Sequence, residues 1–343
     1  MNRIELASGA LRGLRVLITA RSFGRNDPNH LSLLSDYGID LCEYREEGPL
    51  DLDRLADMVK DVDGWVVSVA PVNRAILEQA KRLKIVVKHG VGTDNIDIQA
   101  ADELGIMVAN APGSNHIPVA ELAVGMMLCL SRMIHRAHNS VVSGEWKRFL
   151  GTGLSKKRIG IIGLGRIGMA IAERVRAFDA QVLGFDPFLD QQQRSTLPFV
   201  TWHDNLGEML ANCDLLSVNV PLTDSTTRLI DHVALSHLPA GALVINTARG
   251  RVVDETAVFD ALQSGHLGGY ATDVFEQEPP TGSPLLGLDR VLFTPHVASY
   301  TVDAMKSLGD DVITNLVAGL CGDTPGNRIT AEGCRDVIAS SSH

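Results

Sequence analysis

The feature that most constrains the fold is the sequence GLGRIG at residues 163–168. It directly follows the isoleucine-rich run RIGII, which is typical of a buried strand, and it opens the helical pattern RIGMAIAERVRAF. A G-x-G-x-x-G loop between a strand and a helix is the fingerprint of a dinucleotide-binding βαβ unit. Gly163 permits the tight turn, Gly165 lets the backbone approach a pyrophosphate, and Gly168 lets the helix pack closely on the strand.

The next strand-like run, QVLGF, leads into Asp186, which lies 18 residues after Gly168. An acidic residue at about this distance accepts hydrogen bonds from the adenosine ribose of NAD. A carboxylate there repels the 2′-phosphate of NADP, and the adjacent stretch DPFLD contains no arginine. The sequence therefore predicts NAD rather than NADP as the cofactor.

Strand-like and helix-like runs alternate along most of the 343 residues, in one series from residue 15 and a second from residue 157. This alternation predicts βαβ units, parallel sheets and an α/β fold. Between the two series, Pro118 suits the first turn of a single helix that we expect to run to about Ser143. The pattern changes near residues 110 and 298, as expected if one domain is inserted into another.

Composition excludes several classes of function. The net charge is −10, with 31 Lys and Arg against 41 Asp and Glu, which argues against nucleic-acid or anionic-membrane binding. The five cysteines form no C-x-x-C pair, so we expect reduced thiols and no metal site. The N-terminus lacks the apolar core of a signal peptide, and the most apolar run is too short to span a bilayer. We therefore expect a cytoplasmic protein.

Three polar residues fall at or just past the ends of predicted strands: Arg249, Glu278 and His296. Ligands of open α/β sheets bind beyond the carboxyl ends of the strands, so these side chains are expected to converge on one substrate. Glu276 is a competitor of Glu278 for the acidic role.

The motifs GLGRIG, NTARGRVVDETAV, ATDVFEQEP, TPHVAS and KHGVGTDNID resemble those of the NAD-dependent D-2-hydroxyacid dehydrogenases. This family includes phosphoglycerate, glycerate and D-lactate dehydrogenases, and the resemblance covers roughly residues 12 to 325. It implies two domains. A Rossmann domain with a doubly wound parallel sheet, at 109–298, is inserted into a flavodoxin-like substrate domain made of 1–108 and 299–343. It also implies a homodimer.

The resemblance assigns the catalytic roles to Arg249, Glu278 and His296. Arg249 pairs with the substrate carboxylate and polarises the 2-oxo oxygen, because a guanidinium matches a carboxylate. His296 donates a proton to that oxygen as a hydride reaches C2, and Glu278 orients the imidazole and favours its charged form. The expected reaction is reversible hydride transfer between NAD(H) and a small 2-hydroxy or 2-oxo acid.

Further contacts are implied by the same resemblance. Val91 and Gly92 are expected to bind the substrate carboxylate through their backbone, with Val91 also near the nicotinamide. Asp273 is expected on the nicotinamide side, with closure of the strand end as its alternative role. The other residues expected to line the NAD are Arg166, Ile167, Val220, Thr247 and Ala248.

The substrate itself stays open between 3-phosphoglycerate and an unphosphorylated acid such as glyoxylate or hydroxypyruvate. The stretch GEWKR at 144–148 resembles a segment of phosphoglycerate dehydrogenases that reaches a neighbouring subunit's site, so Lys147 or Arg148 could meet a phosphate. Against a phosphate, Ala70 stands where those enzymes carry a phosphate-binding arginine, and Arg74 follows four residues later.

Three other functional classes share features with this sequence. An NAD-sensing binding protein without significant turnover is the alternative to an enzyme, and a phosphite dehydrogenase uses a similar catalytic set. Glu278 argues against the formate dehydrogenases, which carry a glutamine there.

His89 and His116 are candidates for residues that line the substrate cleft, with core or capping roles as the alternative. The apolar helix face with Met126, Met127 and Leu130 indicates a dimer contact as well as core.

Overall fold

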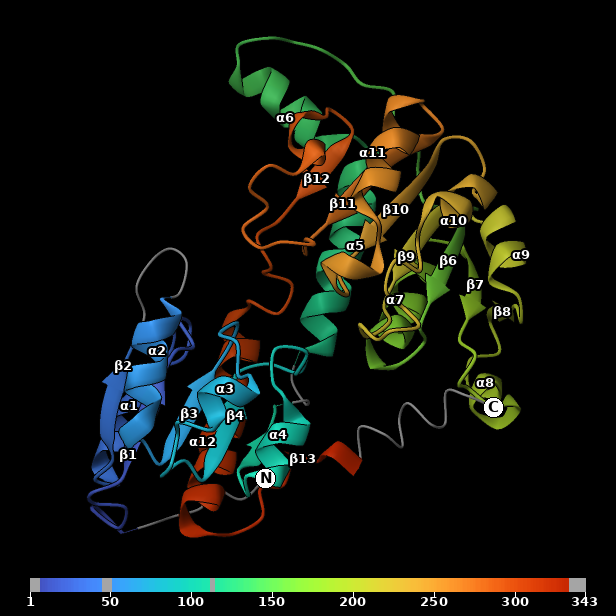
Figure 1. The fold of residues 1–343 in the computed structure, drawn as a ribbon. Coiled ribbons are helices and arrows are strands. Elements are labelled where there is room, and N and C mark those ends of the chain that lie inside the picture. Colours follow the sequence, from blue (N-terminus) through green and yellow to red (C-terminus); the bar gives the residue numbers. More distant parts are fainter. Residues whose placement is uncertain (1–6, 45–50, 112–114, 333–343) are drawn as a thin grey trace. The chain divides into compact units, whose positions relative to one another are not determined.

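A computed structural model describes residues 7–44, 51–111 and 115–332. The chain forms two compact units (Figure 1). Unit 1 combines both ends of the chain, residues 1–115 and 300–343, and unit 2 is the continuous segment 116–299.

Unit 1 is built on a six-stranded sheet with the order β13-β5-β4-β3-β1-β2. All neighbours are parallel except β13, which is antiparallel to β5. Without β13 the order is the doubly wound one of flavodoxin-like folds. The strands are β1 (Arg15–Ile18), β2 (Asp40–Glu43), β3 (Gly64–Val67), β4 (Ile85–Lys88), β5 (Met107–Ala109) and β13 (Arg328–Ile329).

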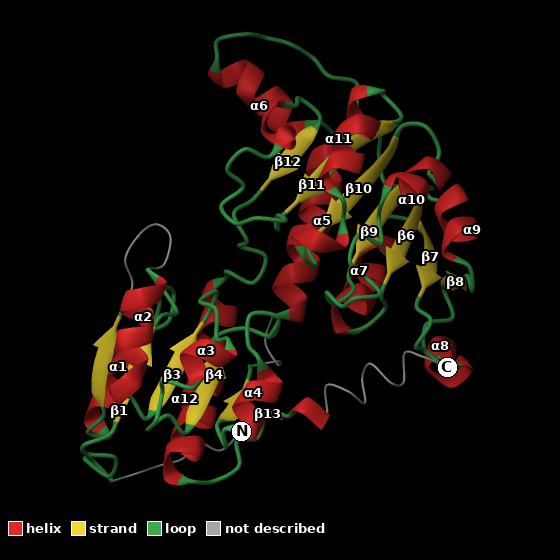
Figure 2. Ribbon diagram, viewed as in Figure 1, coloured by secondary structure: helices red, strands yellow, loops and turns green. Residues whose placement is uncertain are grey.

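Helices cover both faces of this sheet (Figure 2). Successive strand residues point to opposite faces, so Val66 packs in the core beneath α1 and α12 while Trp65 packs beneath α2, α3 and α4. The helices are α1 (Asn29–Asp36), α2 (Leu52–Met58), α3 (Arg74–Leu77), α4 (Ile98–Glu103) and α12 (Val302–Cys321).

Unit 2 is built on a seven-stranded, fully parallel sheet with the order β12-β11-β10-β9-β6-β7-β8. This order reverses between β6 and β9, as in a Rossmann fold. The strands are β6 (Arg158–Ile162), β7 (Gln181–Phe185), β8 (Val200–Trp202), β9 (Leu215–Val218), β10 (Ala242–Asn246), β11 (Leu267–Thr272) and β12 (Val291–Phe293).

Two apolar cores hold the helices of unit 2 to its sheet. One core joins α5 and α7 to the face that carries Ile159 and Ile161, and the other joins α9, α10 and α11 to the opposite face, which carries Leu216 and Val244. The helices are α5 (His116–Ser131), α6 (Ile134–Val142), α7 (Arg166–Arg176), α8 (Gln191–Ser195), α9 (Leu206–Ala211), α10 (His232–His237) and α11 (Glu255–Gln263).

The single helix predicted from Pro118 to about Ser143 is wrong. Pro118 does lie in the first turn of α5, but α5 ends at Ser131 and Met133 adopts a left-handed conformation with φ of 52°. A left-handed residue cannot continue a right-handed helix, so α6 starts in a new direction, bent by 66° from α5. Among the described residues no single helix is long and apolar enough to cross a membrane, and this bent pair meets the length and composition test only when taken together.

Candidate active site

The predicted site residues of unit 2 follow the carboxyl ends of its strands. Gly163 follows β6, Asp186 follows β7, Val220 lies just beyond β9, and Thr247, Ala248 and Arg249 follow β10. Asp273 follows β11, and His296 lies just beyond β12. Because all of these strands are parallel, the residues lie at one edge of the sheet, around the point between β6 and β9 where ligands of doubly wound folds bind (Figure 1).

The glycine loop has the geometry that its motif requires. Gly163 has φ of 82°, which favours glycine, and a Cβ at Gly168 would lie 2.0 Å from the carbonyl oxygen of Gly163. A Cβ at Gly165 would meet nothing within 4 Å, so this glycine leaves open space in front of the loop. Gly165 also provides no side-chain cap for α7, whose first turn begins at Arg166 and Ile167. The amides of this helix N-terminus therefore suit an anionic group.

Asp186 is almost fully buried and is attached to the glycine loop. Its Oδ2 accepts a hydrogen bond from the amide of Leu164 at 2.9 Å, and its Oδ1 accepts one from the amide of Phe188 at 3.0 Å. Each carboxylate oxygen can accept a further hydrogen bond, so ribose hydroxyls can be added without breaking these contacts.

Two buried polar atoms beside the switch point have no hydrogen-bond partner within the described part of the chain. They are Oγ1 of Thr247, after β10, and Oδ1 of Asn219, after β9. A buried polar atom without a partner is unfavourable, so their position suits a bound polar ligand such as a dinucleotide. Thr247 was expected from the sequence, whereas Asn219 was missed because no motif marks it beyond its place at a strand end. These residues fit NAD.

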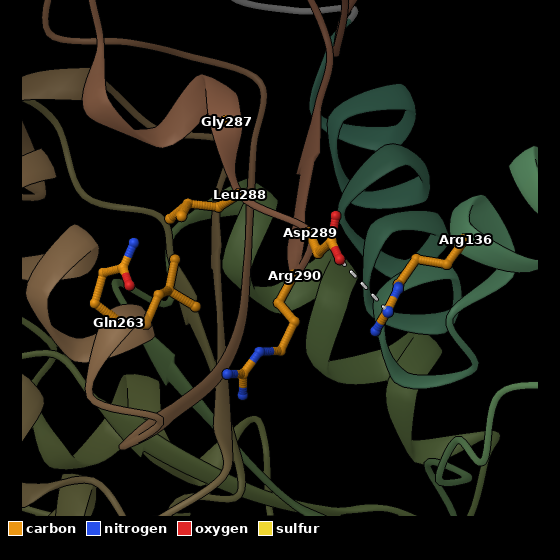
Figure 3. Close-up of a pocket in the computed structure, with 7 residues that line it drawn as sticks. Arg136, Gln263, Gly287, Leu288, Asp289 and Arg290 are labelled. Carbon is orange, nitrogen blue, oxygen red and sulfur yellow. Dashed lines mark ion pairs between the residues drawn. The ribbon is translucent and has the colours of Figure 1, made fainter.

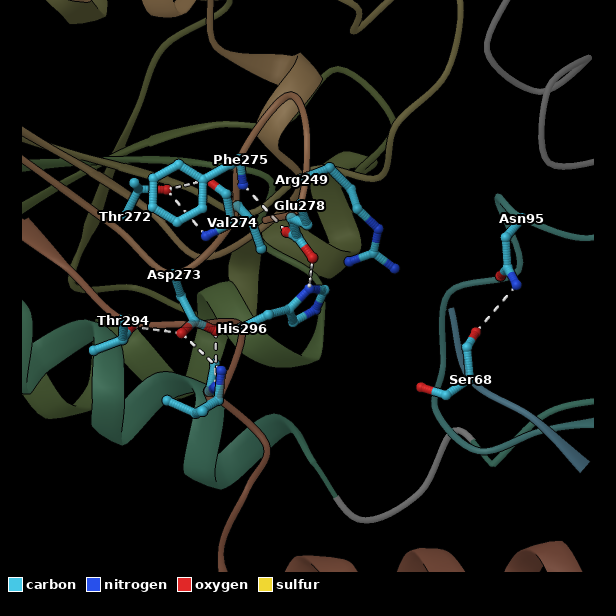
Figure 4. A network of polar contacts seen from close by, with 12 residues as sticks. Ser68, Asn95, Arg249, Thr272, Asp273, Val274, Phe275, Glu278, Thr294 and His296 are labelled. Atoms are coloured by element: carbon cyan, nitrogen blue, oxygen red, sulfur yellow. Dashed lines mark hydrogen bonds and ion pairs between the residues drawn. The ribbon is translucent and has the colours of Figure 1, made fainter. Parts of the chain in front are cut away.

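His296 and Glu278 form a hydrogen-bonded pair at the same edge (Figure 4). The Nδ1 atom of His296 lies 2.8 Å from Oε2 of Glu278, and Oε1 of Glu278 accepts a hydrogen bond from the amide of Phe275 at 3.2 Å. The competitor, Glu276, instead accepts a hydrogen bond from the amide of Glu255 at 3.3 Å. Of the two acids, Glu278 is therefore the one beside the imidazole.

The pKa of Glu278 lies below its ordinary value. Burial is the largest single influence and raises this pKa, but the hydrogen bond with His296, the charge of His296, the Phe275 amide and the charge of Arg249 together outweigh it. Glu278 is consequently a carboxylate over the physiological pH range.

Arg249 is brought to the pair by a close backbone approach. It directly precedes Gly250, where a Cβ would lie 1.9 Å from the carbonyl group of Phe275, so only glycine fits. The Arg249 guanidinium donates a hydrogen bond to the carbonyl of Ala248 at 2.7 Å, and it extends on the same side as Glu278 and His296 (Figure 4).

Asp273 is fully buried and holds the segment that carries His296. Its carboxylate accepts hydrogen bonds from Oγ1 of Thr294 at 2.5 Å and from the amides of Val297 and Ala298 at 2.8 Å each, and its carbonyl accepts one from the amide of His296 at 2.8 Å. His296 has φ of 53°, a left-handed conformation that is costly for a non-glycine residue. These contacts match the role of closing the strand end. A nicotinamide contact of Asp273 stays a prediction.

Val91 and Gly92 belong to unit 1, where they follow β4. The carbonyl of Val91 accepts a hydrogen bond from Nδ2 of Asn110 at 2.7 Å. Within the described residues, the amides of Val91 and Gly92 have no acceptor, so both can donate to an anion.

The adjacent loop is held by polar contacts that the sequence did not reveal. Lys88 donates to the carbonyl of Ser68 and to Oδ1 of Asn95. The Nδ2 atom of Asn95 donates to the carbonyls of Ser68 at 3.1 Å and Ala70 at 2.6 Å (Figure 4).

The candidate phosphate ligands make contacts of their own. Arg74 pairs with Glu103 at 2.6 Å and approaches Glu78 at 4.0 Å, and Lys147 pairs with Glu145 at 2.8 Å.

The two candidate histidines differ in their hydrogen bonds. His89 is buried in unit 1 with Nδ1 3.2 Å from Oγ of Ser22. His116, in unit 2, has a buried Nδ1 without a partner among the described residues.

A cavity of about 350 Å³ lies elsewhere in unit 2 (Figure 3). Asp289 and Arg290 line it and directly precede β12, so it lies at the amino ends of the strands, away from His296 and Glu278. An ion pair of 3.7 Å joins Asp289 to Arg136 across it. This cavity is not part of the candidate site.

Comparison with known proteins identifies the family. The model of the D-isomer specific 2-hydroxyacid dehydrogenase NAD-binding domain matches residues 124–298. The D-3-phosphoglycerate dehydrogenase of Methanocaldococcus jannaschii is 38% identical over 307 residues, which are 88% of this chain and 58% of that protein. The enzyme of the same name from Mycobacterium tuberculosis is 40% identical over 280 residues, 81% of this chain and 52% of that protein. The chain thus spans little more than half the length of these relatives.

Solved structures share the fold over the whole length of the matched chains. A protein from Thermus thermophilus superposes with a TM-score of 0.85 at 31% identity, covering 92% of this chain and 100% of that one. The apo structure of D-lactate dehydrogenase from Escherichia coli gives a TM-score of 0.80 at 27% identity, with the same coverage of 92% and 100%. The chain therefore belongs to the D-isomer-specific 2-hydroxyacid dehydrogenase family, and residues 124–298 form its NAD-binding domain.

Proposed function

We propose that this protein is an NAD-dependent D-2-hydroxyacid dehydrogenase that transfers a hydride reversibly between NAD(H) and a small 2-hydroxy or 2-oxo acid. The observation that carries the proposal is the hydrogen bond of 2.8 Å between His296 and Glu278, next to Arg249 and at the sheet edge that carries the glycine loop. An imidazole–carboxylate pair beside a guanidinium can supply the proton and the polarisation that hydride transfer to a carbonyl needs.

NAD would be held by the switch-point residues of unit 2, and when bound it supplies the hydride acceptor or donor. The α7 N-terminus suits the pyrophosphate and Asp186 suits the adenosine ribose. The proposed cofactor contacts are Gly163, Gly165, Arg166, Ile167, Gly168, Asp186, Val220, Thr247, Ala248 and Asp273.

His296 is proposed as the proton donor in reduction and the proton acceptor in oxidation. Because Nδ1 faces Glu278, Nε2 is the nitrogen left to meet the substrate oxygen. The carboxylate of Glu278 stabilises the imidazolium and fixes the orientation of the ring. Asp273 fixes the backbone of the same segment, so proton transfer takes place from a defined position.

Arg249 is proposed to bind the substrate carboxylate and to polarise the 2-oxo group, since its guanidinium offers paired donors. Val91 and Gly92 are proposed as additional donors to that carboxylate. This part of the proposal is supported by the two amides that have no acceptor within the described residues.

Among substrates we put 3-phosphoglycerate first, because the curated relatives at 35–40% identity carry the name D-3-phosphoglycerate dehydrogenase. An unphosphorylated acid, glyoxylate or hydroxypyruvate, is the second candidate. It is favoured by the ion pairs of Arg74 with Glu103 and of Lys147 with Glu145, which already engage two of the candidate phosphate ligands.

We propose further that the protein is a cytoplasmic homodimer. Met126, Met127 and Leu130 are buried in the core of unit 2, so they are not available for the dimer contact that was expected on that face. We place this contact on α6 and the segment after it instead. There Val142 is 72% exposed, Trp146 79% and Leu150 95%, so these apolar side chains are available for contact with a second copy. The free thiols Cys42, Cys129, Cys213 and Cys321 suit a reducing compartment. Light scattering that gives the mass of one chain would contradict the dimer.

The test is NADH consumption with 3-phosphohydroxypyruvate, hydroxypyruvate, glyoxylate, pyruvate and 2-oxoglutarate. The highest kcat/KM with the phosphorylated acid identifies a phosphoglycerate-type enzyme. A preference for an unphosphorylated acid identifies the second candidate. Binding of NADH without reduction of any acid would replace the enzyme by an NAD-sensing binding protein.

A further inference from the structure

The loop that carries Asp186 is held by an arginine from α8, the short helix that follows it. Arg194 on α8 donates from Nη2 to the carbonyl of Asp186 and from Nε to the carbonyl of Leu189, both at 3.1 Å. One guanidinium thereby joins the two ends of segment 186–189. The stretch DPFLD beside Asp186 gave no sign of it, because Arg194 lies beyond that stretch, eight residues after Asp186.

Two further contacts engage the same guanidinium. Its Nη1 donates to Oδ1 of Asp204 at 2.6 Å, and its Cζ lies 5.2 Å from the centre of the Trp202 ring. The Arg194 side chain is only 20% exposed, whereas that of Asp204 is 88% exposed. Hydrogen bonds from three of its nitrogens and one aromatic face therefore restrain Arg194 from several directions.

These contacts bear on the choice of cofactor. In dinucleotide-binding folds, an acidic residue at the end of this strand recognises the ribose of NAD, while a nearby arginine accommodates the 2′-phosphate of NADP. This chain has both residue types at the same place. The arginine, however, donates to the backbone of the acid's own loop, and its charge is already paired with Asp204.

We propose that Arg194 is a specificity-determining positioning residue that makes the site select NAD over NADP. It holds the 186–189 loop in the shape that presents the Asp186 carboxylate, and its contacts keep its guanidinium from turning toward a 2′-phosphate. This inference rests on the proposed binding of NAD, and it does not depend on turnover or on the identity of the acid.

The positioning role is tested by equilibrium binding of NADH and NADPH, followed by the fluorescence of the bound nucleotide without any acid present. Arg194→Met is expected to raise the dissociation constant of NADH about tenfold, since the loop loses two hydrogen bonds from a charged donor. Arg194→Lys is expected not to restore it, because an ammonium cannot reproduce the fork.

Arg176→Met is the matched control. Arg176 also stacks on an aromatic ring in unit 2, 4.7 Å from the centre of Phe199, but it makes no contact with the 186–189 loop among the described residues. This variant is expected to bind NADH like the wild type. Thermal denaturation of each variant checks that it is folded. A folded Arg194→Met variant with an unchanged NADH dissociation constant would overturn the positioning role.

The restraint on the guanidinium is tested with Asp186→Ser and Asp204→Asn, singly and together. Asp186→Ser alone is expected to weaken NADH binding without creating tight NADPH binding, because Arg194 stays paired with Asp204. The double variant is expected to bind NADPH about tenfold or more tightly than Asp186→Ser does, since one restraint and one compensating charge are gone.

The outcomes separate this inference from the proposed function. Equal NADPH affinity in Asp186→Ser and in the double variant would show that Asp204 does not restrain Arg194. Equal affinity of the wild type for NADH and NADPH would overturn the selectivity itself. A wild-type protein that binds neither nucleotide would instead refute the proposed cofactor.

Discussion

The Nδ1 atom of His296 lies 2.8 Å from Oε2 of Glu278, although 17 residues separate them in the chain. Glu278 lies in the segment after β11, and His296 lies just beyond β12, the neighbouring parallel strand. The sheet thus brings the two side chains together at one edge, and Asp273 fixes the backbone on the His296 side through four hydrogen bonds. A rigid pair of this kind is suited to proton transfer.

Replacement of His296 by alanine removes the proposed proton donor. We expect kcat for reduction of the best 2-oxo acid to fall by about 100-fold or more, the order of magnitude of a lost general acid. The dissociation constant of NADH should stay near the wild-type value, because the proposed cofactor loop is separate. Steady-state kinetics and NADH titration measure both. Near-wild-type turnover would refute the assignment.

Replacement of Glu278 by glutamine keeps the shape of the pair and removes its charge. Since the pKa of Glu278 lies below its ordinary value, the carboxylate stays ionised as the pH falls and continues to stabilise the imidazolium. In the variant that support is lost at every pH. The pH at which reductive activity declines should therefore move to lower pH, with a lower maximal rate.

Glu276→Gln is the control for this pH profile, because Glu276 contacts the amide of Glu255 and not His296. Its profile should coincide with that of the wild type. If the Glu276 variant shifted the profile and the Glu278 variant did not, the acidic role would belong to Glu276.

Two glycines of the 163–168 loop should respond differently to alanine. A Cβ at Gly168 would lie 2.0 Å from the carbonyl oxygen of Gly163, so Gly168→Ala should lower the free energy of unfolding by about 2 kcal/mol or more. A Cβ at Gly165 meets no neighbour, so Gly165→Ala should leave the unfolding free energy within about 1 kcal/mol and still weaken NADH binding. Urea unfolding and NADH titration separate the two effects. Normal NADH binding by Gly165→Ala would argue against a pyrophosphate at this loop.

Asp214 joins the start of β6 to the start of β9 and makes stability depend on pH. Its Oδ2 accepts a hydrogen bond from the amide of Arg158 at 2.9 Å, and its Oδ1 lies 2.8 Å from Nη2 of Arg158. The hydrogen bond from the Arg158 side chain is the largest influence and holds the pKa of Asp214 below its ordinary value, against the effect of burial. The pair therefore stabilises the fold above the ordinary pKa of aspartate, and this contribution is lost as the pH falls through the lower folded value.

Asp214→Asn should lower the free energy of unfolding by about 1–2 kcal/mol at neutral pH, and the difference should shrink as the pH falls below the ordinary pKa of aspartate. Asp57→Asn is the control, because Asp57 forms an exposed pair with Lys60 and should change stability by less than about 0.5 kcal/mol. Urea unfolding at neutral and acidic pH gives both values. A constant difference between the Asp214 variant and the wild type at all pH values would contradict the linkage.

The sequence predicted the parallel α/β architecture and the sheet edge of the candidate site because both predictions follow from local patterns. The isoleucines of β6 mark a buried strand, the glycines after it mark the turn, and the end of each parallel strand is at the same edge. Arg249 and His296 could thus be expected near the glycine loop without knowledge of any contact.

Features that depend on tertiary contacts could not be predicted in this way. The break between α5 and α6 at Met133 has no glycine or proline to mark it. Strand β2 was missed because it has exposed or partly exposed residues at every position. The run NRAILEQAKRL, from Asn73, has a helical pattern, but it yields only the single turn α3. The contact of Arg194 with the Asp186 carbonyl joins residues eight positions apart that no motif connects.

The proposed dehydrogenase activity is tested most directly by the initial rate of NADH consumption with each acid of the panel, for the wild type and for Arg249→Gln and His296→Ala under the same conditions. We expect saturable turnover of at least one 2-oxo acid by the wild type, and loss of about 100-fold or more of kcat/KM in each variant. Saturable NADH binding with no turnover of any acid, or turnover that both variants retain, would contradict it.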